Sequence, residues 1–182
     1  EPLLLLHGGL GHSAGWHGQI AAFAEHFKVI TMDSRGHGRS TFDAAPISYA
    51  LMATDVLALL DHLGIERVHV VGWSDGGIIG LELAVHHPER LGKLVAYGAN
   101  YIPAGVRTDI GDNERFNQFI AAASADYQQV SPAAARWQEF LDNIGRMWAN
   151  EPHYSDAQMG AISSPVLVFG GEQEEAIYVE HI

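Results

Sequence analysis

Short apolar runs alternate with helical patterns along most of this chain. The runs that have the length and composition of buried strands cover residues 2–6, 28–32, 68–71, 91–97 and 165–169. Between the first four of them, apolar positions recur at helical spacing over residues 16–27, 48–63 and 78–87. Strands that alternate with helices are typical of a parallel sheet covered on both faces. The pattern therefore predicts an α/β fold, doubly wound around a mostly parallel sheet.

Between residues 100 and 163 the alternation stops and helical patterns continue without a strand-like run. Such an excursion between two strands of one sheet predicts a helical cap inserted at about residues 101–162, with its aromatic side chains forming mainly its own core. We interpret residues 1–182 as one domain. It is predicted to be incomplete at both ends, because it opens directly on an apolar run and stops within a predicted helix.

The strand at 68–71 leads into the sequence Gly-Trp-Ser-Asp-Gly at residues 72–76, and a helical pattern follows at once. A serine between two glycines at a strand-to-helix junction is the layout of a nucleophile elbow, where the tight turn leaves room only for small flanking residues. This context predicts Ser74 as a nucleophile. The alternative is a tight turn without a catalytic role.

A serine nucleophile needs hydrogen-bond donors for the oxyanion that forms on the acyl carbon. The backbone N–H of Asp75 begins the following helix and is one predicted donor. The turn after the first strand is predicted to supply the second, from Gly9 in the first place and Leu10 in the next, unless it is a plain turn. We expect Leu10, Trp73 and Trp148 to line the substrate pocket.

An acid that orients the catalytic base is expected just after a later strand. Glu172, Glu174 and Glu175 follow the last predicted strand, although glutamates are also common in the solvated first turn of a helix. The base itself is not evident. The histidines after Ser74 are expected to be structural or surface residues, and the one at position 37 to make hydrogen bonds within its loop; those after Ser74 are His86, His87, His153 and His181.

Composition narrows the function further. The formal net charge of −12 argues against nucleic acid as a partner, since that binding depends on clustered Lys and Arg. The chain contains no cysteine, which excludes disulfides and a cysteine nucleophile and is compatible with a cytoplasmic location. The apolar runs are strand-length, so no membrane span is expected. The histidine spacing fits no metal motif, and we expect neither a metal nor another cofactor.

These motifs together resemble the α/β-hydrolase superfamily over nearly the whole chain. The resemblance rests on His-Gly-Gly at residues 7–9, Asp-Ser-Arg-Gly-His-Gly-Arg-Ser at 33–40 and the elbow at 72–77. The elbow is most similar to the esterase and lactonase-like branch related to biphenyl- and valacyclovir-hydrolase-like proteins. The resemblance implies Glu174 as the triad acid, with Glu172 in reserve. It also implies a larger sheet, and a catalytic histidine that follows one further strand, outside this chain.

The sequence thus predicts a serine hydrolase that cleaves a small carboxylic ester, lactone or related acyl bond through an acyl-enzyme. The resemblance implies that dehalogenases and epoxide hydrolases have Asp at the elbow, so Ser74 argues against them. Two alternatives stay open: a cofactor-free perhydrolase or haloperoxidase-like enzyme, and a non-catalytic binding protein on the same fold. The Asp75 side chain is predicted either to pair with a cationic substrate group or to cap its helix. By itself the chain is predicted to be inactive and marginally stable.

Overall fold

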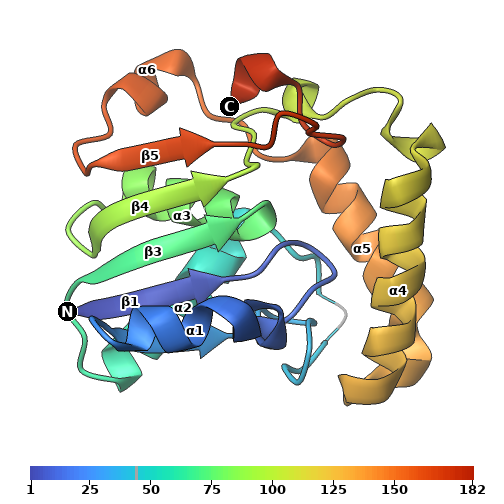
Figure 1. The fold of residues 1–182 in the computed structure, drawn as a ribbon, viewed down its shortest axis with the longest axis horizontal. Coiled ribbons are helices and arrows are strands. Elements are labelled where there is room, and N and C mark those ends of the chain that lie inside the picture. Colours follow the sequence, from blue (N-terminus) through green and yellow to red (C-terminus); the bar gives the residue numbers. More distant parts are fainter. Residues whose placement is uncertain (44) are drawn as a thin grey trace.

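A single parallel sheet forms the centre of the computed structural model, which describes residues 1–43 and 45–182. The order of its five strands is β2-β1-β3-β4-β5, and every neighbouring pair is parallel (Figure 1). The strands are β1 (Pro2–Leu6), β2 (Lys28–Met32), β3 (Val68–Trp73), β4 (Leu91–Tyr97) and β5 (Val166–Phe169). The predicted α/β architecture is confirmed, with strand bounds that differ from the sequence pattern by at most two residues.

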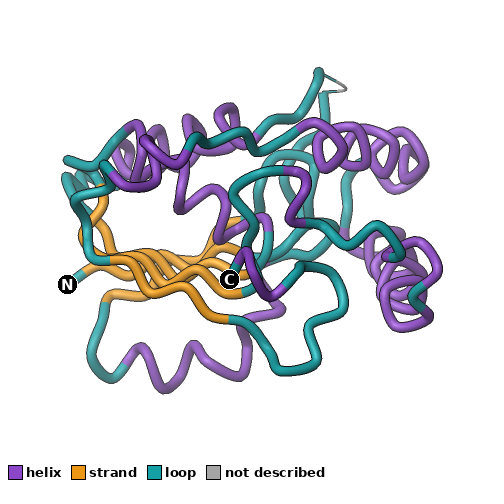
Figure 2. Tube along the Cα trace, turned by 90° about the horizontal axis from the view of Figure 1, so that it is seen from above, coloured by secondary structure: helices purple, strands orange, loops and turns teal. Residues whose placement is uncertain are grey.

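Helices cover both faces of this sheet, as the doubly wound prediction requires (Figure 2). In Figure 1, α1 (His17–Ala24) lies in front of the sheet, and α2 (Tyr49–His62) and α3 (Asp75–His86) lie behind it. A 3-10 turn at Ser13–Trp16 precedes α1, so this helix is shorter than the apolar pattern indicated.

The two faces of the sheet are buried to different degrees. Side chains that point toward α2 and α3, such as Leu4 and Leu94, are at most 1% exposed. On the opposite face Trp73 is 40%, Leu167 58% and Phe169 44% exposed. Because side chains alternate along a strand, each buried strand places every second residue on one of these faces. The main core therefore lies between the sheet and the α2–α3 layer.

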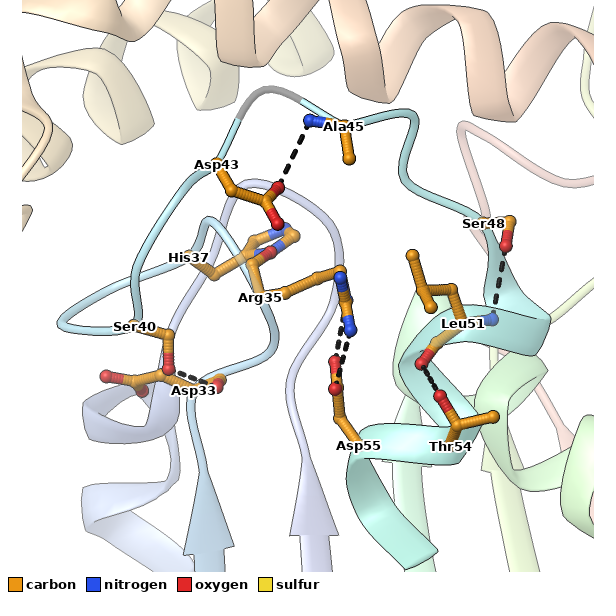
Figure 3. A network of polar contacts seen from close by, with 10 residues as sticks. All are labelled: Asp33, Arg35, His37, Ser40, Asp43, Ala45, Ser48, Leu51, Thr54 and Asp55. Carbon is orange, nitrogen blue, oxygen red and sulfur yellow. Dashed lines mark hydrogen bonds and ion pairs between the residues drawn. The ribbon is translucent and has the colours of Figure 1, made fainter. Parts of the chain in front are cut away.

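The loop at residues 33–40 is tied to its surroundings by polar contacts (Figure 3). Arg35 makes two charge-assisted hydrogen bonds to Asp55 of α2, at 2.7 and 2.6 Å. Ser40 Oγ donates to the carbonyl of Asp33. Ser48 caps α2 as the sequence predicted, since its Oγ accepts from the backbone N–H of Leu51 at 3.1 Å. The carboxyl ends of β1 and β2 are thereby joined to the start of α2.

The helices between β4 and β5 are α4 (Glu114–Val130), α5 (Trp137–Asn150) and α6 (Asp156–Gly160). In Figure 1, α4 and α5 stand beyond the carboxyl ends of the strands. Phe140 of α5 is fully buried against Tyr127 of α4 and Phe42 of the core loops. None of the helices in the described ranges is long and apolar enough to cross a membrane.

The segment after β5 corrects one prediction. A helix was expected from the acidic run to the end of the chain, but only a short 3-10 turn forms, at Val179–His181. Residues 176–178 are instead extended and bound to the segment at 105–107. Ile177 pairs with Val106 in an isolated bridge, and the N–H of Arg107 donates to Ala176 O at 2.8 Å. Hydrogen bonds to a distant part of the backbone outweigh the local helical pattern.

Candidate active site

Ser74 lies in a strained turn between β3 and α3. Its φ of 51° and ψ of −119° fall where non-glycine residues are rare. The turn is fixed by its backbone: Ser74 N–H donates to Tyr97 O at 2.7 Å, and Ser74 O accepts from Gly77 N–H at 2.8 Å. A Cβ on Gly76 would lie 2.2 Å from Leu6 O, so the helix can approach β1 only with glycine here. The local geometry is that of the elbow predicted from the sequence.

The turn after β1 lies directly against the elbow. A Cβ on Gly9 would lie 2.5 Å from both Asp75 Oδ2 and Trp148 Cζ2, and a Cβ on Gly8 would lie 3.2 Å from that of Ser74. Within the described residues, no acceptor binds the backbone N–H of Gly9, Leu10 or Asp75. The predicted oxyanion donors are therefore gathered beside Ser74 with their N–H groups unused by the protein.

His7 holds this turn in place. Its Nε2 accepts from the backbone N–H of Ser34 at 3.0 Å, and its Nδ1 lies 2.8 Å from the carbonyl of Gly8. These partners assign the proton to Nδ1. Burial lowers the pKa of the imidazole, which keeps it neutral. With both nitrogens engaged, His7 positions the loop and is not free to act as a base for Ser74.

The side chain of Asp75 is buried, contrary to both roles considered for it. Its Oδ1 accepts from Tyr49 Oη of α2 at 2.8 Å and from Trp148 Nε1 of α5 at 2.9 Å. It makes no helix-capping hydrogen bond, and its acceptor sites face these two donors and not an open mouth. Burial raises the pKa of Asp75 to about 6, against the lowering effect of the two hydrogen bonds. The carboxylate thus joins three helices at the residue after Ser74.

Two cavities meet at Ser74. The first, of about 300 Å³, extends between α2, α5 and the segment 100–110, and its polar lining includes Asp75, Asn100 and Glu151. The second, of about 200 Å³, is lined by Gly9, Trp73 and Glu174 among others. Ser74 and Trp148 belong to both walls. The Ser74 hydroxyl can therefore serve a ligand that reaches into either space.

Glu174 and Ser74, predicted to act together, line the same cavity although they are far apart in the sequence. Glu174 Oε1 accepts from the backbone N–H of Ala176 at 2.9 Å, which holds the carboxylate in place. Glu172 is exposed and lines neither cavity. Leu10 also differs from expectation: its side chain is 4% exposed and belongs to the hydrophobic core, not to either wall.

No histidine lines either cavity within residues 1–43 and 45–182. His86 lies 3.7 Å from Glu82 on α3, and the ring of His181 packs on Tyr101 at 5.1 Å. His37 makes the predicted loop hydrogen bond, to Arg35 O, and burial lowers its pKa to about 3. The structure thus brings the nucleophile, the donors and an acid together without a described base.

Sequence reasoning missed Tyr49, Asn100 and Glu151 on the wall of the first cavity. Tyr49 and Glu151 carry no motif, and they meet because Glu151 Oε2 accepts from the backbone N–H of Tyr49 at 2.9 Å. Asn100 follows β4, and polar residues just after parallel strands are a general signal for a site at the sheet's carboxyl edge. That signal was available in the sequence and would have pointed to Asn100.

Comparison with known proteins agrees with this architecture. The family model described as alpha/beta hydrolase fold matches residues 1–159. A protein of Caulobacter segnis named as a candidate carbamate hydrolase, RutD, is 47% identical over 96 residues, which are 51% of this chain and 36% of that protein. The chain therefore matches little more than a third of that relative's length.

Two further relatives extend over more of the chain. The 3-oxoadipate enol-lactonase 2 of Acinetobacter baylyi is 41% identical over 142 residues, covering 75% of this chain and 50% of the relative. The crystal structure of a hydrolase from Pseudomonas aeruginosa superimposes with a TM-score of 0.72 at 27% identity. That superposition covers 99% of this chain and 75% of the other.

Proposed function

The chain belongs to the alpha/beta hydrolase fold family, and on that premise we propose that it is the core of a serine hydrolase acting on a small ester, lactone or related acyl bond. One observation carries the proposal. Ser74, in its strained turn, lines a cavity together with Gly9 and Glu174. A nucleophile, a donor for the oxyanion and an acid thus surround one space that a reacting acyl group can enter.

In the proposed mechanism Ser74 Oγ attacks the acyl carbon and forms an acyl-enzyme. The backbone N–H groups of Gly9 and Asp75 donate to the oxyanion of the tetrahedral intermediate. An imidazole in the second cavity accepts the Ser74 proton and later activates water, and Glu174 stabilises its charged form. The amino end of α3 favours negative charge beside Asp75. The protein's part in catalysis is therefore to position Ser74 and to stabilise developing charge.

The substrate class rests on the cavity and on the relatives. The first cavity is mainly apolar and its volume of about 300 Å³ suits a small acyl group. Relatives are named as a candidate carbamate hydrolase and as an enol-lactonase, and both names denote cleavage at an acyl carbon. Both observations support acyl transfer without selecting one leaving group.

The test is chemical rescue of the 182-residue chain by free imidazole, with p-nitrophenyl acetate as substrate. Because imidazole itself hydrolyses this ester, the rate with Ser74→Ala is the blank. We expect a Ser74-dependent rate that rises with imidazole concentration and then saturates, as for binding in a cavity. Ser155→Ala, at an exposed serine far from both cavities, is the matched control and should behave as wild type. Equal rates for wild type and Ser74→Ala at every imidazole concentration would overturn the proposal.

A second candidate is binding of an acyl ligand without turnover. The observation that favours it is that no described histidine lines either cavity. In this case a ligand would bind beside Ser74, and imidazole would add no Ser74-dependent rate. The rescue experiment together with a binding titration separates the two candidates.

A further inference from the structure

The polar lining of the first cavity is anionic. Its walls are apolar apart from Tyr49, Ser74, Asn100 and two carboxylates, Asp75 and Glu151. No lysine, arginine or histidine lines it among the residues that the structure describes. A ligand in this space therefore meets negative charge with no side-chain cation to balance it.

Both carboxylates are held by the protein and cannot turn away freely. Trp148 Nε1 donates to both oxygens of Asp75, at 2.9 and 3.0 Å. Glu151 follows the last residue of α5, and its Oε2 accepts from the backbone N–H of Tyr49 at 2.9 Å. These donors are neutral, so they fix the two groups without cancelling their charge. Only the amino end of α3 offsets part of the field.

Both groups carry charge at mildly alkaline pH. The pKa of Asp75, raised by burial to about 6, lies below 7.5, so the carboxylate is mostly ionised there. Tyr49, whose pKa burial raises well above its ordinary value, remains a neutral donor. Behind the cavity Glu82 accepts from Tyr154 and adds a further carboxylate on the same side. Charges in a water-poor site interact more strongly than charges in bulk solvent.

We propose that Asp75 and Glu151 are specificity-determining residues, which make this cavity accept uncharged acyl groups and reject acyl groups that end in a carboxylate. The proposal rests on the proposed function, in that it takes this cavity as the acyl site beside Ser74. Placing a ligand carboxylate next to two fixed carboxylates brings like charges together, and such contacts are strongly unfavourable. An uncharged chain of the same size gains the apolar contacts without that cost.

The test uses two ligands of equal size, hexanamide and hexanoate, with the ¹⁵N-labelled 182-residue chain at pH 7.5. The indole N–H of Trp148 lies on the cavity wall and donates to Asp75, so its NMR signal reports occupancy directly. Trp148→Phe identifies that signal by its loss. We expect hexanamide to bind at least about tenfold more tightly than hexanoate.

Two variants remove charge and keep hydrogen-bond geometry. Asp75→Asn retains an oxygen that can accept from Tyr49 and Trp148, and Glu151→Gln retains one for the Tyr49 N–H. Each should narrow the preference for hexanamide by at least about threefold, mainly through tighter binding of hexanoate. Glu25→Gln makes the same charge change at an exposed position at the end of α1, and should leave the preference unchanged.

Three results would overturn the proposal: equal affinity of the wild-type chain for the two ligands, an unchanged preference in both variants, or no shift of the Trp148 signal with either ligand. If Asp75→Asn fails to fold, Glu151→Gln still decides the matter. The readout is binding and needs no turnover. A failed imidazole rescue would therefore remove the proposed function without removing the selectivity, and a failed titration would do the reverse.

Discussion

Two carboxylates flank Ser74, and the molecule holds them in opposite ways. Asp75 is buried and receives side-chain hydrogen bonds from α2 and α5. Glu174 lies in an irregular segment after β5 and receives hydrogen bonds from the backbone of the two residues that follow it closely, Ala176 and Ile177. The Asp75 side is therefore built from distant elements, whereas the Glu174 side is built locally.

The difference teaches where stability and chemistry are separated. Burying a charged group costs free energy unless hydrogen bonds compensate it, and the raised pKa of Asp75 shows that the compensation is incomplete. Glu174 needs no such network, because it remains partly accessible in the second cavity. We expect changes at Asp75 to alter folding and cavity shape, and changes at Glu174 to alter reactivity alone.

The largest effect is expected where the Asp75 side is tightest. In Gly9→Ala the new methyl group would lie 2.5 Å from both Asp75 Oδ2 and Trp148, and should lower the free energy of unfolding by about 3 kcal/mol. Gly15→Ala is the matched control, because nothing lies within 4 Å of its Cβ position, and should change stability by less than about 0.5 kcal/mol. Urea unfolding measures both. Equal stability of the two variants would mean that the Gly9 contact can relax freely.

The next effect is a pH dependence from Asp75. Its pKa is about 6 in the folded chain and near 3.8 when unfolded, so between these values the folded state binds more protons. Stability should therefore fall as pH rises from 4 to 6, by about 2 kcal/mol from this group. Asp75→Asn removes that contribution. The difference in unfolding free energy between variant and wild type, measured from pH 4 to 7, isolates it from groups common to both. A difference that does not change with pH contradicts the prediction.

A smaller effect is expected for Tyr49→Phe, which removes one of the two donors to Asp75. Loss of a buried hydrogen bond to a carboxylate should cost about 1.5 kcal/mol and raise the pKa of Asp75 further. Tyr178→Phe removes a hydroxyl whose hydrogen bond to Thr108 is exposed, and should cost less than about 0.5 kcal/mol. Thermal and urea unfolding of the pair give the comparison. Equal costs would show that burial does not strengthen the Tyr49 contact.

The smallest effect on stability is expected at Glu174. Glu174→Gln keeps an oxygen for the Ala176 N–H and should change the free energy of unfolding by less than about 0.5 kcal/mol. The imidazole-rescued rate should nevertheless fall at least about tenfold, because the neutral amide no longer stabilises imidazolium. Glu172→Gln, on an exposed side chain off both walls, should leave that rate unchanged. A loss of stability with an intact rescued rate would reverse the roles given to the two carboxylates.

Much of this architecture was predictable from local sequence. Apolar runs bounded by turn residues gave the strands, and Ser48 marked the start of α2. Local patterns failed where distant contacts decide the conformation. The acidic run at 172–175 has the composition of a helix start, yet hydrogen bonds to residues 105–107 hold the following residues extended. Asp75 was expected at an open mouth or as a cap, because the sequence contains no sign that Trp148 closes over it.

By itself the sequence determined the parallel sheet and the strained turn at Ser74, because alternating apolar runs and a glycine at position 76 leave the backbone few other arrangements. The tertiary structure alone decided the surroundings of that serine. It brought Glu174 to the second cavity and enclosed Asp75 between α2 and α5. Burial and long-range hydrogen bonds set the charge and the shape of a site, and neither is encoded in the spacing of residues along a chain.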